Sequence, residues 1–168
     1  MANRSITPVN VDLEDTVART FVLFVQTADA VLKYADTRFY KAGLSIAKFV
    51  VLQVLAANGG TMTPSEIAEW TLREPHNITT LVDRMRKEGL IKTEPHRSDK
   101  RSINVTLTDK GRKVLSQSAP VAREIVAQVM SSITDGHTAA LGEPLRLMRQ
   151  SAHRGLEHIN EHSEPKPG

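Results

Sequence analysis

The fold is decided by residues 72–113, LREPHNITTLVDRMRKEGLIKTEPHRSDKRSINVTLTDKGRK. This stretch begins with a helical pattern bounded by Pro75, which suits a first helical position, and Gly89, which suits a left-handed residue after a helix. One helical stripe is apolar and is expected to face a core: Ile78, Leu81, Val82 and Met85. The opposite face is polar: His76, Asn77, Thr80, Asp83, Arg84 and Lys87. Taken alone, this pattern fits an ordinary solvated helix as well as one that enters a DNA groove.

Two strand-like runs follow, Leu90 to Thr93 and Ser102 to Leu107, and they predict an antiparallel hairpin. Its tip is rich in basic and polar residues and includes Arg97 and Lys100. An arginine at such a tip suits the narrow minor groove of DNA, and Asp99 lies two residues before Arg101, where it can orient the guanidinium. An ordinary hairpin turn remains the alternative for this loop.

A second helix is predicted just upstream, because Thr63, Pro64 and Glu66 form a capping box with proline at the first helical position. Its body, residues 65–71, buries Ile67 and Ala68, with Trp70 as a further candidate. A turn of about three residues then leads to the Pro75 helix, which is the spacing of a helix-turn-helix. With the hairpin added, the predicted unit is a winged helix.

The run from Val51 to Val114 resembles the DNA-binding half of the MarR family of bacterial regulators. The resemblance rests on TPSEIA at 63–68, ITTLVDRMRKEGLI at 78–91 and DKRSINVTLTDKG at 99–111. The last stretch is the most specific, because it combines the D-x-R pattern of the wing with L-T-x-x-G at a fixed offset. The resemblance implies a mainly α fold with a small antiparallel β wing, flanked by N- and C-terminal dimerisation helices.

The same resemblance assigns the site residues. It places His76, Asn77, Thr79 and Thr80 against base edges or nearby phosphates, Arg84 on the DNA backbone and Arg101 in the minor groove. The full predicted DNA-binding set is Pro75, His76, Asn77, Thr79, Thr80, Arg84, Arg97, Lys100 and Arg101, with Asp99 orienting the wing. Pro75 and His76 are not the residues most common at these positions, so base preference is not carried over from relatives.

Composition supports a compact DNA-binding chain. The 168 residues are 40% hydrophobic, enough for one ordinary domain or two closely packed subdomains. The net charge is +3, but residues 84–113 carry +6 and the rest of the chain −3, so the positive field is local. No aromatic residue lies between Leu72 and Lys113, which argues against a base-stacking platform for single strands.

The flanking segments predict four more helices. They are residues 12–40, residues 45–57 capped by Ser45, residues 109–132 capped by Thr108 and bent at Pro120, and residues 138–159. Gly142, Pro144 and Gly155 predict a kink or a delayed start in the last of these. The organisation expected from the sequence is therefore an N-terminal dimerisation helix (1–44), the winged helix-turn-helix (45–113), C-terminal dimerisation helices (114–160) and a flexible tail (161–168).

The wide apolar faces of the terminal helices predict a homodimer that binds a pseudo-palindromic operator in double-stranded DNA. By resemblance, such a dimer represses transcription and releases DNA when a small ligand binds. We expect a small aromatic or phenolic effector in a pocket between the first two helices and the start of the 109–132 helix. Candidate lining residues are Phe24, Tyr34, Arg38, Phe39 and Trp70.

Several other functions find no support in the sequence. The absence of cysteine removes disulfides and thiol redox sensing, and no motif for catalysis or for a cofactor is present, so we expect neither enzyme activity nor a cofactor. His153, His158 and His162 cluster near the C-terminus but lack companion ligands, so a solvated tail is favoured over a metal site. Without a signal or membrane-spanning pattern, the expected location is the cytoplasm. A winged helix used only for protein contacts remains the alternative function.

Overall fold

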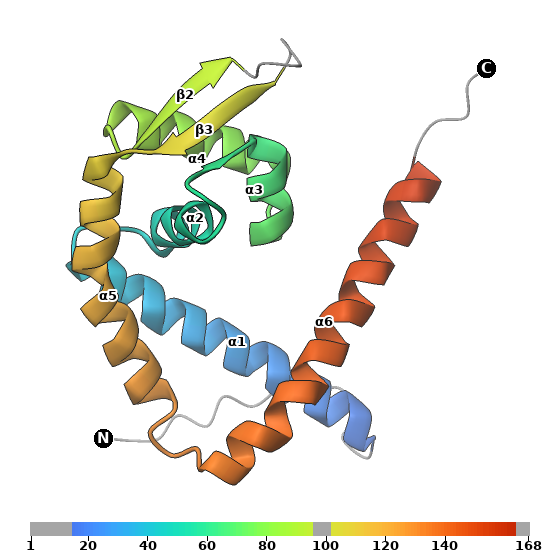
Figure 1. Ribbon diagram of the computed structural model, residues 1–168. Coiled ribbons are helices and arrows are strands. Elements are labelled where there is room, and N and C mark those ends of the chain that lie inside the picture. The colour runs from blue at the N-terminus through green and yellow to red at the C-terminus, as the bar shows by residue number, and fades with distance from the viewer. Residues whose placement is uncertain (1–14, 96–101, 164–168) are drawn as a thin grey trace. The chain divides into compact units, whose positions relative to one another are not determined.

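The computed structural model describes residues 15–95 and 102–163, and it is mostly helical with one small sheet (Figure 1). The elements in chain order are α1 (Thr16–Lys41), α2 (Ile46–Ala57), β1 (Thr61–Met62), α3 (Pro64–Thr71), α4 (Pro75–Lys87), β2 (Ile91–Pro95), β3 (Ile103–Leu107), α5 (Asp109–Val129) and α6 (Asp135–Ser163). They form two compact units, residues 1–127 and residues 128–168, which are described separately. The predicted fold class, mainly α with a small antiparallel wing, is confirmed.

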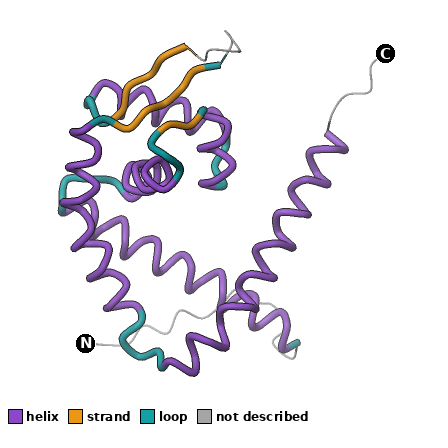
Figure 2. The backbone as a smooth tube through the Cα atoms, in the orientation of Figure 1, coloured by secondary structure: helices purple, strands orange, loops and turns teal. Residues whose placement is uncertain are grey.

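The three strands form one antiparallel sheet in the order β1-β3-β2 (Figure 2). The hairpin of β2 and β3 was predicted, and its register pairs Ile91 with Leu107 and Thr93 with Val105. Sequence reasoning missed β1, which pairs with the other edge of β3. The Thr61 and Thr106 hydroxyls lie 3.1 Å apart across that edge.

The helix-turn-helix is built as the capping pattern predicted. The Thr63 amide donates to the Glu66 carboxylate at 2.7 Å, and the Thr63 hydroxyl accepts from the Glu66 amide at 3.3 Å. After α3, Leu72 adopts a left-handed conformation with φ 52°, which reverses the chain within three residues. After α4, Gly89 adopts a left-handed conformation with φ 72°. In this conformation the Gly89 amide donates to the Arg86 carbonyl, and the Leu90 amide donates to the Met85 carbonyl.

The core of the larger unit lies between the helix-turn-helix and the sheet. Its central residues are fully or almost fully buried and come from α2, α3, α4, all three strands and the turn before β2: Val51, Leu52, Leu55, Met62, Ile67, Ala68, Ile78, Val82, Met85, Leu90, Ile91, Val105 and Leu107. The apolar stripe of α4 is thus the part of that helix that packs against the core. Trp70 is not part of this core, because it is 62% exposed, so its predicted burial is wrong.

The helix α1 buries only Ala35 and Phe39 and leaves most of its apolar face uncovered. The exposed apolar side chains of α1 are Val17, Phe21, Leu23, Phe24, Val25, Leu32 and Tyr40. Among the described residues no single helix is long and apolar enough to cross a membrane. Only α1 and α2 taken together, bent by 90° at their junction, meet that length and composition.

The two C-terminal helices differ from prediction at their ends. The helix α5 begins after the predicted Thr108 cap and contains Pro120, but it ends at Val129 instead of Ser132. Of the two alternatives for α6, the kink stays a prediction and the delayed start is wrong, because the helix starts at Asp135, before the expected Thr138. The reason is a reciprocal cap: the Thr134 hydroxyl accepts from the His137 amide at 3.3 Å, and His137 Nδ1 accepts from the Thr134 amide at 3.4 Å. The helix also reaches Ser163, so the first residues of the predicted tail are helical.

Candidate nucleic-acid interface

The outer face of α4 presents polar and cationic side chains to solvent. On a helix of 3.6 residues per turn, His76, Thr80 and Lys87 lie opposite the buried stripe of Ile78, Val82 and Met85. Asn77 and Arg84 lie along one edge of this exposed face, and Thr79 lies along the other. All the predicted α4 site residues, Pro75, His76, Asn77, Thr79, Thr80 and Arg84, are exposed. The structure therefore brings them onto one accessible surface.

The hydroxyl groups on this surface are oriented by their own helix. The Thr79 hydroxyl donates to the Pro75 carbonyl and the Thr80 hydroxyl to the His76 carbonyl, both at 3.1 Å. Each hydroxyl proton is thus used inside the helix, and the remaining lone pairs can accept a hydrogen bond from a base amino group. Thr79 and Thr80 are therefore prepared to act chiefly as acceptors.

The first turn of α4 differs from the first turns of the other described helices. Asp15, Ser45, Thr63, Thr108 and Thr134 each accept a hydrogen bond from an amide in the first turn of the helix that follows. Glu74, which precedes α4, makes no such side-chain bond. The positive end of the α4 dipole is consequently without a side-chain cap on the surface that carries His76 and Asn77.

The hairpin next to α4 is described as far as Pro95 and again from Ser102. At its described end, Lys92 pairs with Glu94 at 2.8 Å on the exposed side of β2. The predicted wing residues Arg97, Asp99, Lys100 and Arg101 lie outside the described residues. Their roles stay predictions that rest on the sequence.

A close approach between α5 and the end of α4 explains the L-T-x-x-G pattern. Thr108 accepts from the Gly111 amide at 3.0 Å, and its hydroxyl lies 2.8 Å from the Gly89 carbonyl and 2.9 Å from the Leu90 carbonyl. A Cβ atom on Gly111 would lie 2.1 Å from the Leu90 carbonyl oxygen, so a residue with a side chain does not fit. The pattern thus marks the junction at which the start of α5 contacts the C-terminal end of α4.

Three charged residues at this junction were missed by sequence reasoning. Lys48 Nζ lies 2.6 and 2.8 Å from the two carboxylate oxygens of Glu88, and Lys110 Nζ lies 2.6 Å from the Glu88 backbone carbonyl. Lys48 and Glu88 are 40 residues apart, so no local pattern in the sequence connects them.

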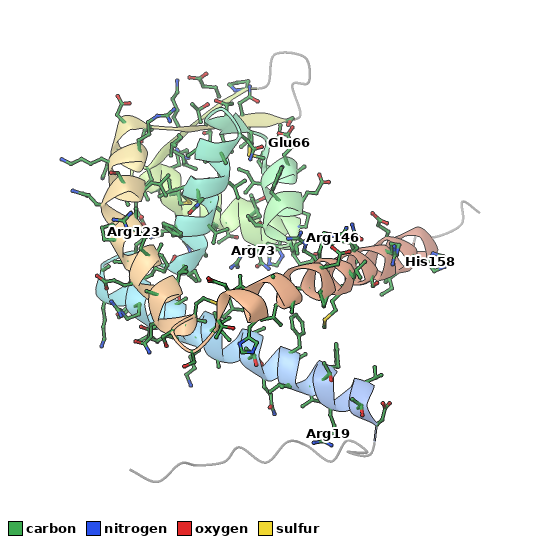
Figure 3. All side chains as sticks on the ribbon, turned by 60° about the horizontal axis from the view of Figure 1, so that its bottom comes forward. Arg19, Glu66, Arg73, Arg123, Arg146 and His158 are labelled. Carbon is green, nitrogen blue, oxygen red and sulfur yellow. The ribbon has the colours of Figure 1, made fainter. Side chains whose placement is uncertain are left out.

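An open cavity of about 440 Å³ lies between α2 and α5. It is lined by small and apolar side chains with a few polar ones: Phe49, Gln53, Ala56, Ala57, Leu115, Ser116, Ala119, Ala122 and Arg123. Arg123, labelled in Figure 3, is the charged side chain among them. The expected effector pocket included α2 and α5, but none of its five candidate residues is among the lining residues.

Those five candidates fall into three places. Phe39 is buried and stacks on the cavity residue Phe49, with ring centroids 4.5 Å apart. Arg38 bonds the Tyr34 hydroxyl at 2.9 Å and pairs with Glu124 of α5. The Tyr34 hydrogen bond, followed by that to Glu124, raises the pKa of Arg38 further above its ordinary value. Phe24 and Trp70 are 37% and 62% exposed. Arg38 and Phe39, with Tyr34 bonded to Arg38, thus connect α1 with the two helices that line the cavity.

The C-terminal histidines do not assemble with other ligands in the described part of the chain. Within it, no group of three or more histidine and carboxylate side chains is arranged to hold a metal ion. His153 and His158 lie on α6, whose exposed surface also carries an ion pair between Glu143 and Arg146 at 2.5 Å. Arg146 lowers the pKa of Glu143 through that hydrogen bond.

The sequence matches known regulators over much of its length. The model of the MarR family matches residues 42–102, which cover α2, the helix-turn-helix and β2 but end before β3. The HTH-type transcriptional repressor NicR of Pseudomonas putida is 30% identical over 108 residues, covering 64% of this chain and 68% of that protein. The repressor IacR of Pseudomonas putida is 26% identical over 132 residues, covering 79% of this chain and 74% of that protein.

Solved structures share the fold. A MarR family regulator from Streptomyces coelicolor, solved in complex with DNA, superposes with a TM-score of 0.76 at 23% identity, covering 88% of this chain and 92% of that one. An organohalide-sensing regulator bound to 2,4-dichlorophenol superposes with a TM-score of 0.73 at 24% identity, covering 90% and 89%. With the capping box, the wing pattern and the NicR match, these findings show that the chain belongs to the MarR family of transcriptional regulators.

Proposed function

We propose that this protein is a homodimeric, ligand-responsive repressor that binds a pseudo-palindromic site in double-stranded DNA. The observation that carries the proposal is the exposed polar and cationic face of α4 beside the β2–β3 hairpin. A face with this charge does not suit the centre of a protein–protein interface, because such centres are depleted of charged residues. It fits the major groove, where short hydrogen-bonding side chains contact base edges.

Each residue of this surface takes a defined part in the proposed complex. His76, Asn77, Thr79 and Thr80 contact base edges or neighbouring phosphates, with the two threonines accepting from base amino groups. Arg84 contacts the phosphate backbone, and Pro75 sets the entry of the helix into the groove. In the wing, Arg97 and Lys100 contact phosphates, and Arg101 enters the minor groove in a pose held by Asp99.

Dimerisation follows from the apolar surface that the chain leaves uncovered. Phe21, Leu23 and Leu32 of α1 are each more than half exposed. On α6, Leu141, Leu145, Leu147, Leu156 and Ile159 are exposed as well. A monomer with this much exposed apolar surface on helix faces is typical of a chain that pairs with a second copy. We therefore assign residues 1–44 and 114–160 to the dimer and residues 45–113 to DNA.

The effector site is the cavity between α2 and α5. Its lining is mainly apolar and includes the cationic side chain of Arg123. The cavity therefore suits a small aromatic molecule that carries a carboxylate or phenolate. Among proteins of the same fold, one structure contains 2,4-dichlorophenol, and another concerns regulation of DNA binding of Bordetella bronchiseptica BpsR by 6-hydroxynicotinic acid. These ligands have the size and charge that the cavity would accept. We further propose that the protein acts in the cytoplasm as a regulator and not as an enzyme.

The proposal is tested by selecting duplexes that bind the full-length protein from a randomised library and measuring affinity for the winner by fluorescence anisotropy. The expected site is a pseudo-palindrome with half-sites about one helical turn apart. Its affinity should fall steeply as salt rises, because several phosphate contacts release counterions. If no duplex is enriched and low-salt binding is absent, the winged helix is a protein-interaction module instead.

A further inference from the structure

The C-terminal end of α4 is held from two sides by side chains of α2 and α5. From α2, Lys48 bonds both carboxylate oxygens of Glu88 at 2.6 and 2.8 Å. From the start of α5, Lys110 bonds the Glu88 carbonyl at 2.6 Å, and the Thr108 hydroxyl lies within hydrogen-bond distance of the next two carbonyls. We call Lys48, Glu88, Thr108 and Lys110 the clamp.

Electrostatics makes this end of α4 depend on the clamp. The last carbonyls of a helix lack partners within the helix and carry its negative dipole end, so the Glu88 carboxylate is unfavourable there without a cation. Lys48 and Lys110 supply two ammonium groups against the carboxylate and the carbonyl. The Lys48 side chain is 21% exposed and that of Glu88 is 45% exposed, so solvent and salt screen their attraction in part.

We propose that the clamp sets the orientation of α4, and that Lys48 and Lys110 are therefore positioning residues for DNA binding. This inference rests on the proposed function. Each ammonium group is already bound to Glu88, so the proposal assigns neither lysine to a phosphate, and the salt dependence of binding distinguishes the two roles. The clamp fixes the end of α4 opposite to the end that carries His76 and Asn77, so a small rotation there swings the base-contacting turn.

The clamp also connects α4 with the cavity. Lys48 immediately precedes Phe49, which lines the cavity on α2, and Lys110 lies five residues before Leu115, which lines it on α5. The two helices that enclose the cavity are thus the two that hold Glu88. A ligand that separates α2 from α5 pulls the two sides of the clamp apart, and α4 follows one of them.

The test measures binding of the selected duplex by full-length Lys48→Gln and Lys110→Gln, with Lys166→Gln, which lies outside the segments assigned to DNA and to the dimer, as the matched control. We expect each clamp variant to weaken DNA affinity about three- to tenfold. A contact that positions α4 contributes to affinity only the difference between its free energies in the DNA-binding orientation of the helix and in other orientations. The slope of affinity against salt should stay unchanged, whereas losing a phosphate contact would lower it by about one. The exchanged pair Lys48→Glu with Glu88→Lys should recover most of the affinity.

The clamp is rejected if both lysine variants bind within twofold of the parent, if their salt slope falls by about one, or if the exchanged pair stays as weak as Lys48→Gln. Hydrogen exchange on the free protein decides the same point without DNA. Loss of the clamp should speed exchange of the Gly89 and Leu90 amides, which close the end of α4. If the parent selects no duplex, the proposed function fails, while unchanged exchange at these amides would overturn the clamp itself.

Discussion

Replacement of Gly111 by alanine tests the junction between α5 and α4. A Cβ atom at this position would lie 2.1 Å from the Leu90 carbonyl oxygen and 2.8 Å from Leu107 Cδ1. An ordinary contact between carbon and oxygen is about 3.3 Å or more, so α5 must move by about 1 Å. The obstacle is a backbone carbonyl, which cannot rotate away as a flexible side chain would.

The cost of that movement is estimated from the contacts it breaks. The Leu90 carbonyl accepts from the Thr108 amide at 3.2 Å, and the Thr108 hydroxyl lies 2.9 Å from it. Losing these bonds costs about 1 kcal/mol each, and overpacking against Leu107 adds about 1–3 kcal/mol. The better helix propensity of alanine returns about 1 kcal/mol. The net loss is therefore about 2–4 kcal/mol, or a fall of about 5–15 °C in the melting temperature of a chain of this size.

The assay is thermal unfolding followed by circular dichroism at fixed protein concentration, since a dimer melts at a temperature that depends on concentration. Gly142→Ala in α6 is the matched control, because nothing lies within 4 Å of a Cβ atom there. The control should melt at or slightly above the parent, as alanine favours a helix more than glycine does. If Gly111→Ala melts as high as Gly142→Ala, the close approach of α5 does not exist and the explanation of the L-T-x-x-G pattern is wrong.

Three further predictions concern the helix-turn-helix and the wing. Thr63→Ala removes the capping box of α3 and should lower the free energy of unfolding by about 1 kcal/mol in urea titrations, and an unchanged midpoint would argue against the cap. Asn77→Ala should alter base preference at one or two positions of the selected site by about 1–3 kcal/mol, and repeated selection that returns the same site would remove Asn77 from the base contacts. Arg101→Ala should weaken binding strongly and lower the salt slope, most of all at A·T-rich flanks, whereas parent-like affinity on such duplexes would exclude the minor-groove role.

Much of the fold was accessible from local sequence signals. Thr63, Ser45 and Thr108 were assigned as caps, and Gly89 as the left-handed residue after α4, because capping depends on residues within one turn. The hairpin was found from its alternation. The two-residue strand β1 was missed, since so short a strand has no pattern of its own and exists through its pairing with β3.

The remaining errors come from interactions that a periodic pattern does not contain. Glycine and proline in α6 suggested a kink or a delayed start, but the delayed start is wrong because the reciprocal bonds of Thr134 and His137 start the helix at Asp135. Trp70 was a further candidate for the core, yet its side chain is 62% exposed. At the candidate site, exposure of the α4 residues followed from helix geometry, whereas the contact of Lys48 with Glu88 joins positions far apart in the chain.

The position of Trp70 makes the protein its own optical reporter. The chain contains one tryptophan, and that indole is 62% exposed on α3, five residues before α4 begins. Its emission therefore arises from a single place beside the turn that carries α4. Quenching by iodide, recorded in a stopped-flow instrument as duplex or small aromatic acids are mixed in, would time the movement of that turn without any attached dye.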